Sequence, residues 1–290
     1  MDRITRRAYA KINLGLDVIK RRPDGYHEVK MIMQTVGIYD VLTFFRKKKR
    51  DGSPSITISM DNGELPSGEG NLVYKAAALT MEAFGIREGV EITLEKNIPI
   101  AAGMAGGSAD AAAVFHGMKE LFGLPMEQEE MKRLGVKIGA DVPYCIMGGT
   151  ALSEGIGEVL TPLAPPPAAH LLIAKPDVGV STRFVYENLH ADTLRHHPDI
   201  DGMVKAIGEG NLEGITSRME NVLETVTIRE YPVIRDIKET MKEARALNAL
   251  MSGSGPAVFG VFDTAEAAQA AYEKVRETDL AKRLFVTEFV

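Results

Sequence analysis

Cysteine is almost absent from the sequence, since Cys145 is the only one among 290 residues. A single thiol excludes an intrachain disulfide and a cysteine-based zinc site. The sequence also lacks an apolar run of roughly 20 residues, the length that a membrane-spanning helix needs, and residues 1–7 lack the apolar core of a signal peptide. We therefore expect a cytoplasmic protein in a reducing compartment, without a membrane partner.

An excess of positive charge is absent too. Asp and Glu number 40 against 34 Lys and Arg, a formal net charge of −6, whereas nucleic-acid binding depends on a basic face. The exception is the basic run at residues 46–50, which separates the strand-like segments 41–45 and 56–59. We interpret this run as the solvated tip of a β-hairpin rather than as a nucleic-acid or localisation patch. The sequence therefore predicts no nucleic-acid partner, and no obligate protein partner is evident.

The first half of the chain has clear strand and helix patterns. Residues 8–18 alternate strictly, with Lys11 and Asn13 on the polar face. A second strand region is expected over 28–45, a helix over 71–84 and a strand over 90–94. The glycine-rich loop that follows, up to Ser108, leads into a helix marked by apolar residues from 111 to 122, so it joins a strand to a helix.

The second half mixes strands and helices without a regular β-α-β order. Strands are expected at 171–174, 257–262 and 284–290, and helices around 184–189, 204–208, 216–226, 232–244 and 265–275. The proline cluster at 162–167 indicates a lobe boundary. This pattern predicts an α+β fold in two lobes, residues 1–160 and 161–290, and not a doubly wound sheet.

The glycine loop is a candidate anion site. Glycines let backbone N–H groups approach a phosphate, and the N-terminus of the following helix adds a positive field. Ser108 could cap this helix, or its hydroxyl could face a phosphate or a magnesium ion. No Gly-Lys-Ser/Thr follows, so the loop is not a Walker A motif. A tight strand-to-helix connection without a ligand is the alternative, and a second glycine run at 252–256 is by itself only a turn signal.

Five segments occur in an order and at a spacing that match a known family. They are AYAKINL at 8–14, RPDGYHE at 22–28, PIAAGMAGGSADAA at 99–112, GADVP at 139–143 and LMSGSGP at 250–256. Together they resemble the GHMP kinase family over essentially the whole chain. The first, second and fourth segments are similar to the branch that acts on a cytidyl-linked methylerythritol, and not to the homoserine, galactose or mevalonate enzymes.

The resemblance implies a two-lobed GHMP kinase fold, with a ferredoxin-like second lobe and an active site in the cleft between the lobes. It implies ATP-dependent phosphorylation, with Mg²⁺, of the C2 hydroxyl of the methylerythritol part of a small cytidyl substrate, giving the 2-phosphate and ADP in non-mevalonate isoprenoid synthesis. Asp141 matches the catalytic base, and Lys11 matches its partner between that base and the γ-phosphate. Such transfers depend on alignment and charge neutralisation, with a carboxylate accepting the hydroxyl proton.

The resemblance also implies binding residues. The ATP-binding residues would be Asn71, Leu72, Lys96, Pro99, Ile100, Ala101, Ala102, Gly103, Met104, Ala105, Gly106, Gly107, Ser108 and Ala109. The substrate-binding residues would be Asn13, Tyr26, His27, Thr182 and Tyr186, with Tyr26 and Tyr186 stacking on cytosine and His27 bonding to its edge. Helix core packing is the alternative for Tyr186, and an exposed turn for His27.

Two positions depart from the family pattern, and three functions stay open. Met104 stands where leucine is commoner, and Ala109 stands where a second serine is often found. No metal ligands can be assigned, and we interpret the segment at 196–199, with its two histidines, as a solvated loop. The alternatives to the cytidyl-substrate kinase are another GHMP small-molecule kinase and a non-catalytic GHMP-fold ligand-binding module.

Overall fold

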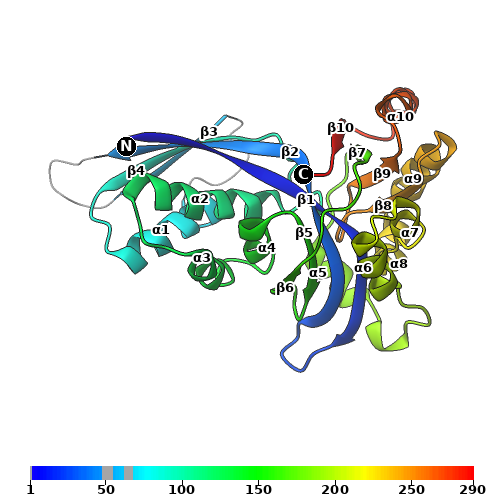
Figure 1. Ribbon diagram of the computed structural model, residues 1–290, viewed down its shortest axis with the longest axis horizontal. Coiled ribbons are helices and arrows are strands. Elements are labelled where there is room, and N and C mark those ends of the chain that lie inside the picture. The colour runs from blue at the N-terminus through cyan, green and yellow to red at the C-terminus, as the bar shows by residue number, and fades with distance from the viewer. Residues whose placement is uncertain (1, 48–54, 62–67) are drawn as a thin grey trace. The chain divides into compact units, whose positions relative to one another are not determined.

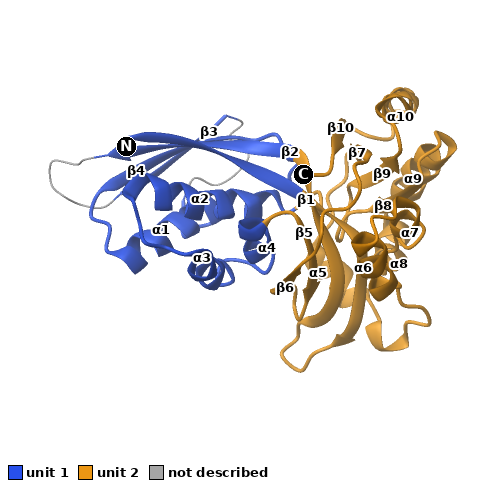
Figure 2. Cartoon of the chain, viewed as in Figure 1, with its two compact units in different colours: residues 1–10, 38–100, 105–147 blue, residues 11–37, 101–104, 148–290 orange. Residues whose placement is uncertain are grey.

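The computed structural model describes residues 2–47, 55–61 and 68–290. By their contacts these residues form two compact units (Figure 2). Unit 1 comprises residues 1–10, 38–100 and 105–147, and unit 2 comprises residues 11–37, 101–104 and 148–290. The predicted boundary between residues 160 and 161 stays a prediction.

Unit 1 places helices on a sheet (Figure 1). Its strands are the start of β1 (Arg3–Arg21), the end of β2 (His27–Lys47), β3 (Ile56–Met60) and β4 (Gly89–Glu95). Its helices are α1 (Leu72–Phe84), α2 (Gly106–Phe122), α3 (Gln128–Gly135) and α4 (Val142–Met147). Helix α2 packs on α1, α3 and α4. Phe44 and Phe115 are fully buried in the resulting core.

The predicted hairpin at 41–59 is wrong. Strand β4 pairs antiparallel with β2 and parallel with β3, so β4 lies between the two strands of the predicted hairpin. Local turn residues cannot reveal a third strand that inserts between two others. Within the basic run, Arg46 is the penultimate residue of β2 and forms an ion pair with Glu88, and residues 48–50 lie outside the described residues.

Unit 2 contains the remainder of β1 and β2 and a separate antiparallel sheet. Strands β5 (Thr150–Glu154) and β6 (Val159–Pro162) extend the β2 side. The separate sheet has the order β10-β7-β9-β8, from β7 (His170–Lys175), β8 (Asn248–Met251), β9 (Val258–Phe262) and β10 (Arg283–Glu288). Helices α9 (Val233–Glu243) and α10 (Ala265–Glu277) pack on it. Antiparallel pairing outside regular β-α-β units confirms the predicted α+β class.

The other helices of unit 2 are short. They are α5 (Thr182–Asn188), a 3-10 turn (Ala191–Thr193), α6 (Ile200–Gly208), α7 (Leu212–Thr216) and α8 (Glu224–Glu230). The helix predicted over 216–226 is wrong, because α7 ends at Thr216 and α8 starts at Glu224. Between them Asn221 forms a β-bridge with Leu16. Buried Met219 and Val222 produced the apolar spacing that suggested a helix.

Candidate active site

Helix α2 begins inside the glycine loop. Its N-cap is Ala105, which has a left-handed backbone, with φ of 55°, and gives no side-chain cap. Ser108 therefore lies in the first turn and is not the N-cap, so the capping alternative for Ser108 is wrong. The first bond of the helix runs from the N–H of Ala109 to the Ala105 carbonyl, at 2.9 Å. Within the described residues, the N–H groups of residues 106–108 have no acceptor, so three donors are left for an anion.

Residues 101–104 of the loop belong to unit 2, where the second glycine run holds them. Ser252 donates its hydroxyl to the Gly103 carbonyl at 2.9 Å, and the N–H of Ala257 donates to the Ala102 carbonyl at 3.2 Å. From β1, the N–H of Lys11 donates to the Met104 carbonyl at 3.2 Å. The structure thus brings together three of the five family segments, at 8–14, 99–112 and 250–256.

Gly103 is required by both its backbone conformation and its close neighbours. Its φ is +76°, and a Cβ there would lie 2.1 Å from the Ser252 carbonyl oxygen. We expect Gly103→Ala to weaken ATP binding at least tenfold and to lower the free energy of unfolding by more than about 2 kcal/mol, because backbone on both sides must move. ATP titration and urea denaturation measure the two effects. Gly25→Ala is the control, since its φ is +88° and nothing lies within 4 Å; equal losses in both variants would contradict the close-contact explanation.

Asn221 was missed by the sequence prediction, although it anchors the second glycine run. Its buried amide donates to the carbonyls of Met251 at 2.9 Å and Gly253 at 2.8 Å. Its Oδ1 accepts the N–H of Leu223 at 3.0 Å. A polar residue inside an apparently helical pattern gave the only signal. Asn221 therefore fixes the turn whose Ser252 supports the glycine loop.

Lys11 and Asn13 are neighbours on the polar face of β1, as the alternation predicted. Both are buried, and the Lys11 ammonium donates to Asn13 Oδ1 at 2.7 Å. Asn13 in turn lies against the sulfur of Met31, at 3.2 Å. Among the described residues of unit 2, no carboxylate pairs with Lys11. A buried ammonium held by a neutral amide alone is costly, so this position suits a lysine that meets an anionic ligand.

Asp141 lies immediately before α4 and is half-buried. Its backbone carbonyl accepts the N–H of Cys145 at 3.0 Å, so the main chain starts the helix. A Cβ at nearby Gly139 would lie 4.0 Å from the Ser108 hydroxyl, which places the segment at 139–141 beside the first turn of α2. Asp141 belongs to unit 1 and Lys11 to unit 2, and their predicted pairing stays a prediction.

The proposed cytosine residues are partly brought together. The rings of His27 and Tyr186 lie 5.2 Å apart at 42°, and Thr182, which opens α5, shares a hydrogen bond of 2.8 Å with Ser254. Tyr26 is 60% exposed, and its N–H donates to the Asp24 carboxylate at 3.1 Å. The structure therefore pairs Tyr186 with His27, and the stacking role of Tyr26 stays a prediction.

His27 has the protonation state that an edge contact needs. Burial, and then the positive charge of Arg21, lower the pKa of His27 below its usual value. The imidazole is therefore neutral at pH 7, with one nitrogen as donor and the other as acceptor.

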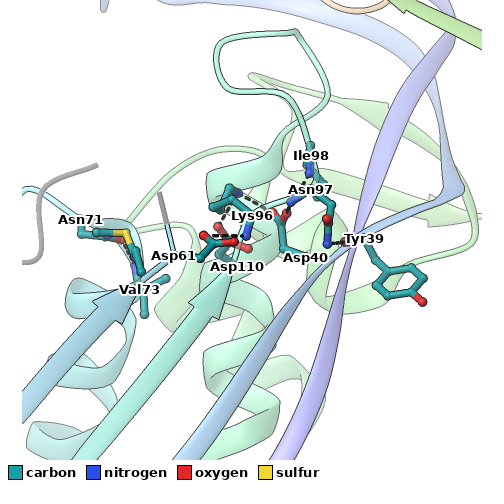
Figure 3. Close-up of polar contacts among 10 residues, drawn as sticks. Tyr39, Asp40, Asp61, Asn71, Val73, Lys96, Asn97, Ile98 and Asp110 are labelled. Atoms are coloured by element: carbon teal, nitrogen blue, oxygen red, sulfur yellow. Dashed lines mark hydrogen bonds and ion pairs between the residues drawn. The ribbon is translucent and has the colours of Figure 1, made fainter. Parts of the chain in front are cut away.

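Three of the proposed ATP-binding residues, Asn71, Leu72 and Lys96, lie in unit 1. Figure 3 shows the polar contacts of Asn71 and Lys96. Asn71 caps α1, with its Oδ1 accepting the N–H of Val73 at 2.9 Å. The buried ammonium of Lys96 pairs with Asp40, and with Asp110 at 2.8 Å. Burial lowers the pKa of Lys96, but the charges of Asp110 and Asp40 outweigh this effect and raise the pKa above its usual value. The sequence prediction missed both carboxylates.

Within the described residues, no group of three or more His, Cys, Asp or Glu side chains could hold a metal ion. His196 pairs with Glu220, and His197 with Asp17. In the same part of the chain, no helix combines the length and apolar composition needed to cross a membrane.

Comparison with known proteins defines the class first. The family model "GHMP kinases N terminal domain" matches residues 71–149, and "GHMP kinases C terminal" matches residues 203–279. The predicted GHMP kinase fold is thereby confirmed. A crystal structure of homoserine kinase from Cytophaga hutchinsonii shares this fold, with a TM-score of 0.78 at 23% identity over 99% of this chain and 94% of that one.

Relatives with higher sequence identity then show to which family of GHMP kinases the chain belongs. A Lachnoclostridium phytofermentans protein named 4-diphosphocytidyl-2-C-methyl-D-erythritol kinase is 53% identical over 289 residues, which is 100% of this chain and 98% of that protein. A protein of the same name from Acetivibrio thermocellus is 47% identical over the full length of both. A crystal structure of 4-(cytidine 5'-diphospho)-2C-methyl-D-erythritol kinase has a TM-score of 0.83 at 31% identity and covers 99% of each chain. The chain belongs to the family of 4-diphosphocytidyl-2-C-methyl-D-erythritol kinases.

Proposed function

We propose that this chain phosphorylates the C2 hydroxyl of 4-diphosphocytidyl-2-C-methyl-D-erythritol with ATP, giving the 2-phosphate and ADP in non-mevalonate isoprenoid synthesis. The observation that carries the proposal is the start of α2, where three N–H donors have no acceptor among the residues that the structure describes, in a chain 53% identical to a protein of that name. A cytoplasmic location belongs to the same proposal.

The proposed chemistry assigns separate tasks to the two candidate catalytic residues. Asp141 would accept the proton of the attacking hydroxyl, a tertiary alcohol of low nucleophilicity. Lys11 would draw charge from the transferring phosphoryl group. Both tasks suit phosphoryl transfer, which is catalysed mainly by alignment and charge neutralisation. Mg²⁺ would accompany ATP and neutralise its phosphate charge. An ion held largely by phosphate oxygens and water needs only one or two protein ligands, and these are not assigned.

A direct assay tests the proposal against its alternatives. Purified protein is mixed with ATP, Mg²⁺ and the cytidyl substrate, and ADP release is followed. Turnover with homoserine or mevalonate instead would favour another GHMP kinase. Binding of the cytidyl compound without ADP release would favour a non-catalytic module.

We expect the cytosine base to be read at its edge. Cytosine has a donor at its exocyclic amine and an acceptor at N3, and uracil has the reverse at the same positions. The neutral imidazole of His27, beside the Tyr186 ring, can supply one edge contact. Each mispaired group in a partly dry site costs roughly 1–3 kcal/mol. The uridine analogue should therefore lose on the order of 10²-fold in kcat/KM.

The variant His27→Ala should reduce this discrimination between cytidine and uridine compounds. His196→Ala is the matched control, because His196 is exposed and pairs with Glu220 in another loop. Competition kinetics with the two nucleotides give the ratio directly. The opposite result would be a wild-type enzyme that phosphorylates the uridine analogue, or methylerythritol phosphate without a nucleotide, with the same kcat/KM as the cytidine compound. In that case the assignment of a cytosine pocket is wrong, and the assignment as another GHMP small-molecule kinase replaces it.

A further inference from the structure

Two buried carboxylates share one buried ammonium in unit 1 (Figure 3). The side chains of Asp40, Lys96 and Asp110 are exposed by 0%, 4% and 2%. Asp40 is fully bonded, because its Oδ2 accepts from Lys96 and its Oδ1 accepts the N–H groups of Asn97 at 2.5 Å and Ile98 at 2.8 Å. Asp110 accepts from Lys96 with Oδ2 alone. We call these three residues the buried triad.

The second oxygen of Asp110 is the exception in this core. Among the buried side-chain polar atoms that the structure describes, Asp110 Oδ1 alone has no hydrogen-bond partner. An ionised carboxylate with a bare, buried oxygen is expensive, so a proton on this group lowers the cost. Burial raises the pKa of Asp110 to about 8; Lys96 opposes this shift and Asp40 adds to it. Near neutral pH the triad then has one ammonium, one carboxylate and one neutral acid.

The triad lies next to the first turn of α2. A Cβ on Gly106, the first residue of the helix, would lie 3.4 Å from the Lys96 ammonium nitrogen. Asp110 belongs to the same helix, four residues after Gly106. Any net charge on the triad therefore acts on an anion bound at residues 106–108, in a part-buried setting where electrostatic interactions are strong.

We infer that Asp110 is a positioning residue for nucleotide binding, which together with Asp40 holds the Lys96 ammonium next to Gly106 and keeps the triad without net charge near the phosphate. This inference rests on the proposed function. Ionisation of Asp110 above pH 8 would leave the triad with a net charge of −1, which repels the phosphates of ATP. Nucleotide binding must then weaken as the pH rises.

The other charged groups around Asp110 do not replace it in this role. Asp61 accepts the backbone N–H of Lys96 at 3.3 Å, and Asp141 precedes α4, which packs on α2. The buried residues of α1 and α3 that face this core are uncharged. Because Asp61 and Asp141 are retained in a variant of Asp110, comparison with the wild type separates the effect of Asp110 from theirs.

The pH profile of KM for ATP is the first test. Between pH 7 and 9 the wild-type KM should rise about tenfold, because a new negative charge appears in α2 about one turn after Gly106, where the phosphates are proposed to bind. Asp110→Asn should hold the ratio of the two KM values below about twofold. Glu120→Gln is the matched control, a carboxylate-to-amide change on the same helix in the exposed pair with Arg6, and should keep the wild-type ratio. A flat wild-type profile, or an equal rise in Asp110→Asn, overturns the inference.

The second test needs neither a variant nor turnover. If a bound anion favours protonated Asp110, then binding of a non-hydrolysable ATP analogue at pH 8.5 must take up protons. Titration calorimetry in two buffers of different ionisation enthalpy measures this uptake. About half a proton or more is expected at pH 8.5 and almost none at pH 6.5; no difference between these pH values overturns the inference. Binding with proton uptake but without ADP release would reject the proposed kinase function and leave the role of Asp110 supported.

Discussion

Asp141→Asn is expected to lower kcat by roughly 10²–10⁴-fold, while the affinities for ATP and for the cytidyl substrate stay within about tenfold. The amide cannot accept the hydroxyl proton, and a general base acts mainly in the transition state. The change should leave the fold intact, because the α4 start depends on the Asp141 backbone carbonyl and not on its carboxylate. Single-turnover kinetics with both ligands saturating measure the chemical step directly.

Asp177→Asn is the control for this variant, since Asp177 is exposed and pairs with Lys282 in unit 2. It should retain wild-type kcat. If Asp141→Asn also turns over at nearly the wild-type rate, Asp141 is not the base. If kcat is unchanged and kcat/KM falls only because substrate affinity falls, then Asp141 contributes equally to the ground state and the transition state. Asp141 would then be a substrate-binding residue and not the general base.

Much of the fold could be predicted because the relevant signals are local. The strict alternation of residues 8–18 specifies β1, and the same alternation places Lys11 and Asn13 on one face, where they bond. Asn71 and the apolar stripe after it specify α1 and its cap. The match to family segments supplied what alternation cannot, namely that distant glycine runs belong together, and Ser252 does contact Gly103.

Other features depend on contacts that no local pattern contains. The insertion of β4 between β2 and β3 is decided by long-range pairing, and the short strands β5, β6 and β8 have four or five residues each, too few for a clear period. Ser108 looked like a cap because serine favours that position, yet the left-handed backbone of Ala105 starts the helix earlier.

The buried charges were the hardest to predict. Asp40 lies in the middle of a strand and Asp110 in an alanine-rich helix, and each would be placed on the surface by its residue type. They are buried because Lys96, far from Asp40 in sequence, lies between them. A sequence shows which residues are charged but not which of them pair with one another, so the triad could be found only in the structure.

Lys11→Met should lower kcat by about 10²–10³-fold, with a smaller effect on ATP affinity, because it removes a positive charge aimed at the transferring phosphoryl group. Methionine keeps much of the length of the side chain and suits the buried surroundings. Pre-steady-state measurement of phosphoryl transfer is the decisive readout. Lys20→Met, at an exposed position of the same strand, is the matched control and should change neither constant.

The stability of Lys11→Met separates a catalytic charge from a structural one. Removing the ammonium relieves the cost of burying a charge that has only the Asn13 amide as its partner in unit 2. The same change leaves Asn13 Oδ1 without that donor, which costs roughly 1–3 kcal/mol. These effects oppose each other, so the free energy of unfolding should change by less than about 2 kcal/mol while kcat falls by orders of magnitude. A large loss of stability with kcat retained in the folded fraction would make Lys11 a structural residue, and a change in ATP affinity alone would make it a binding residue.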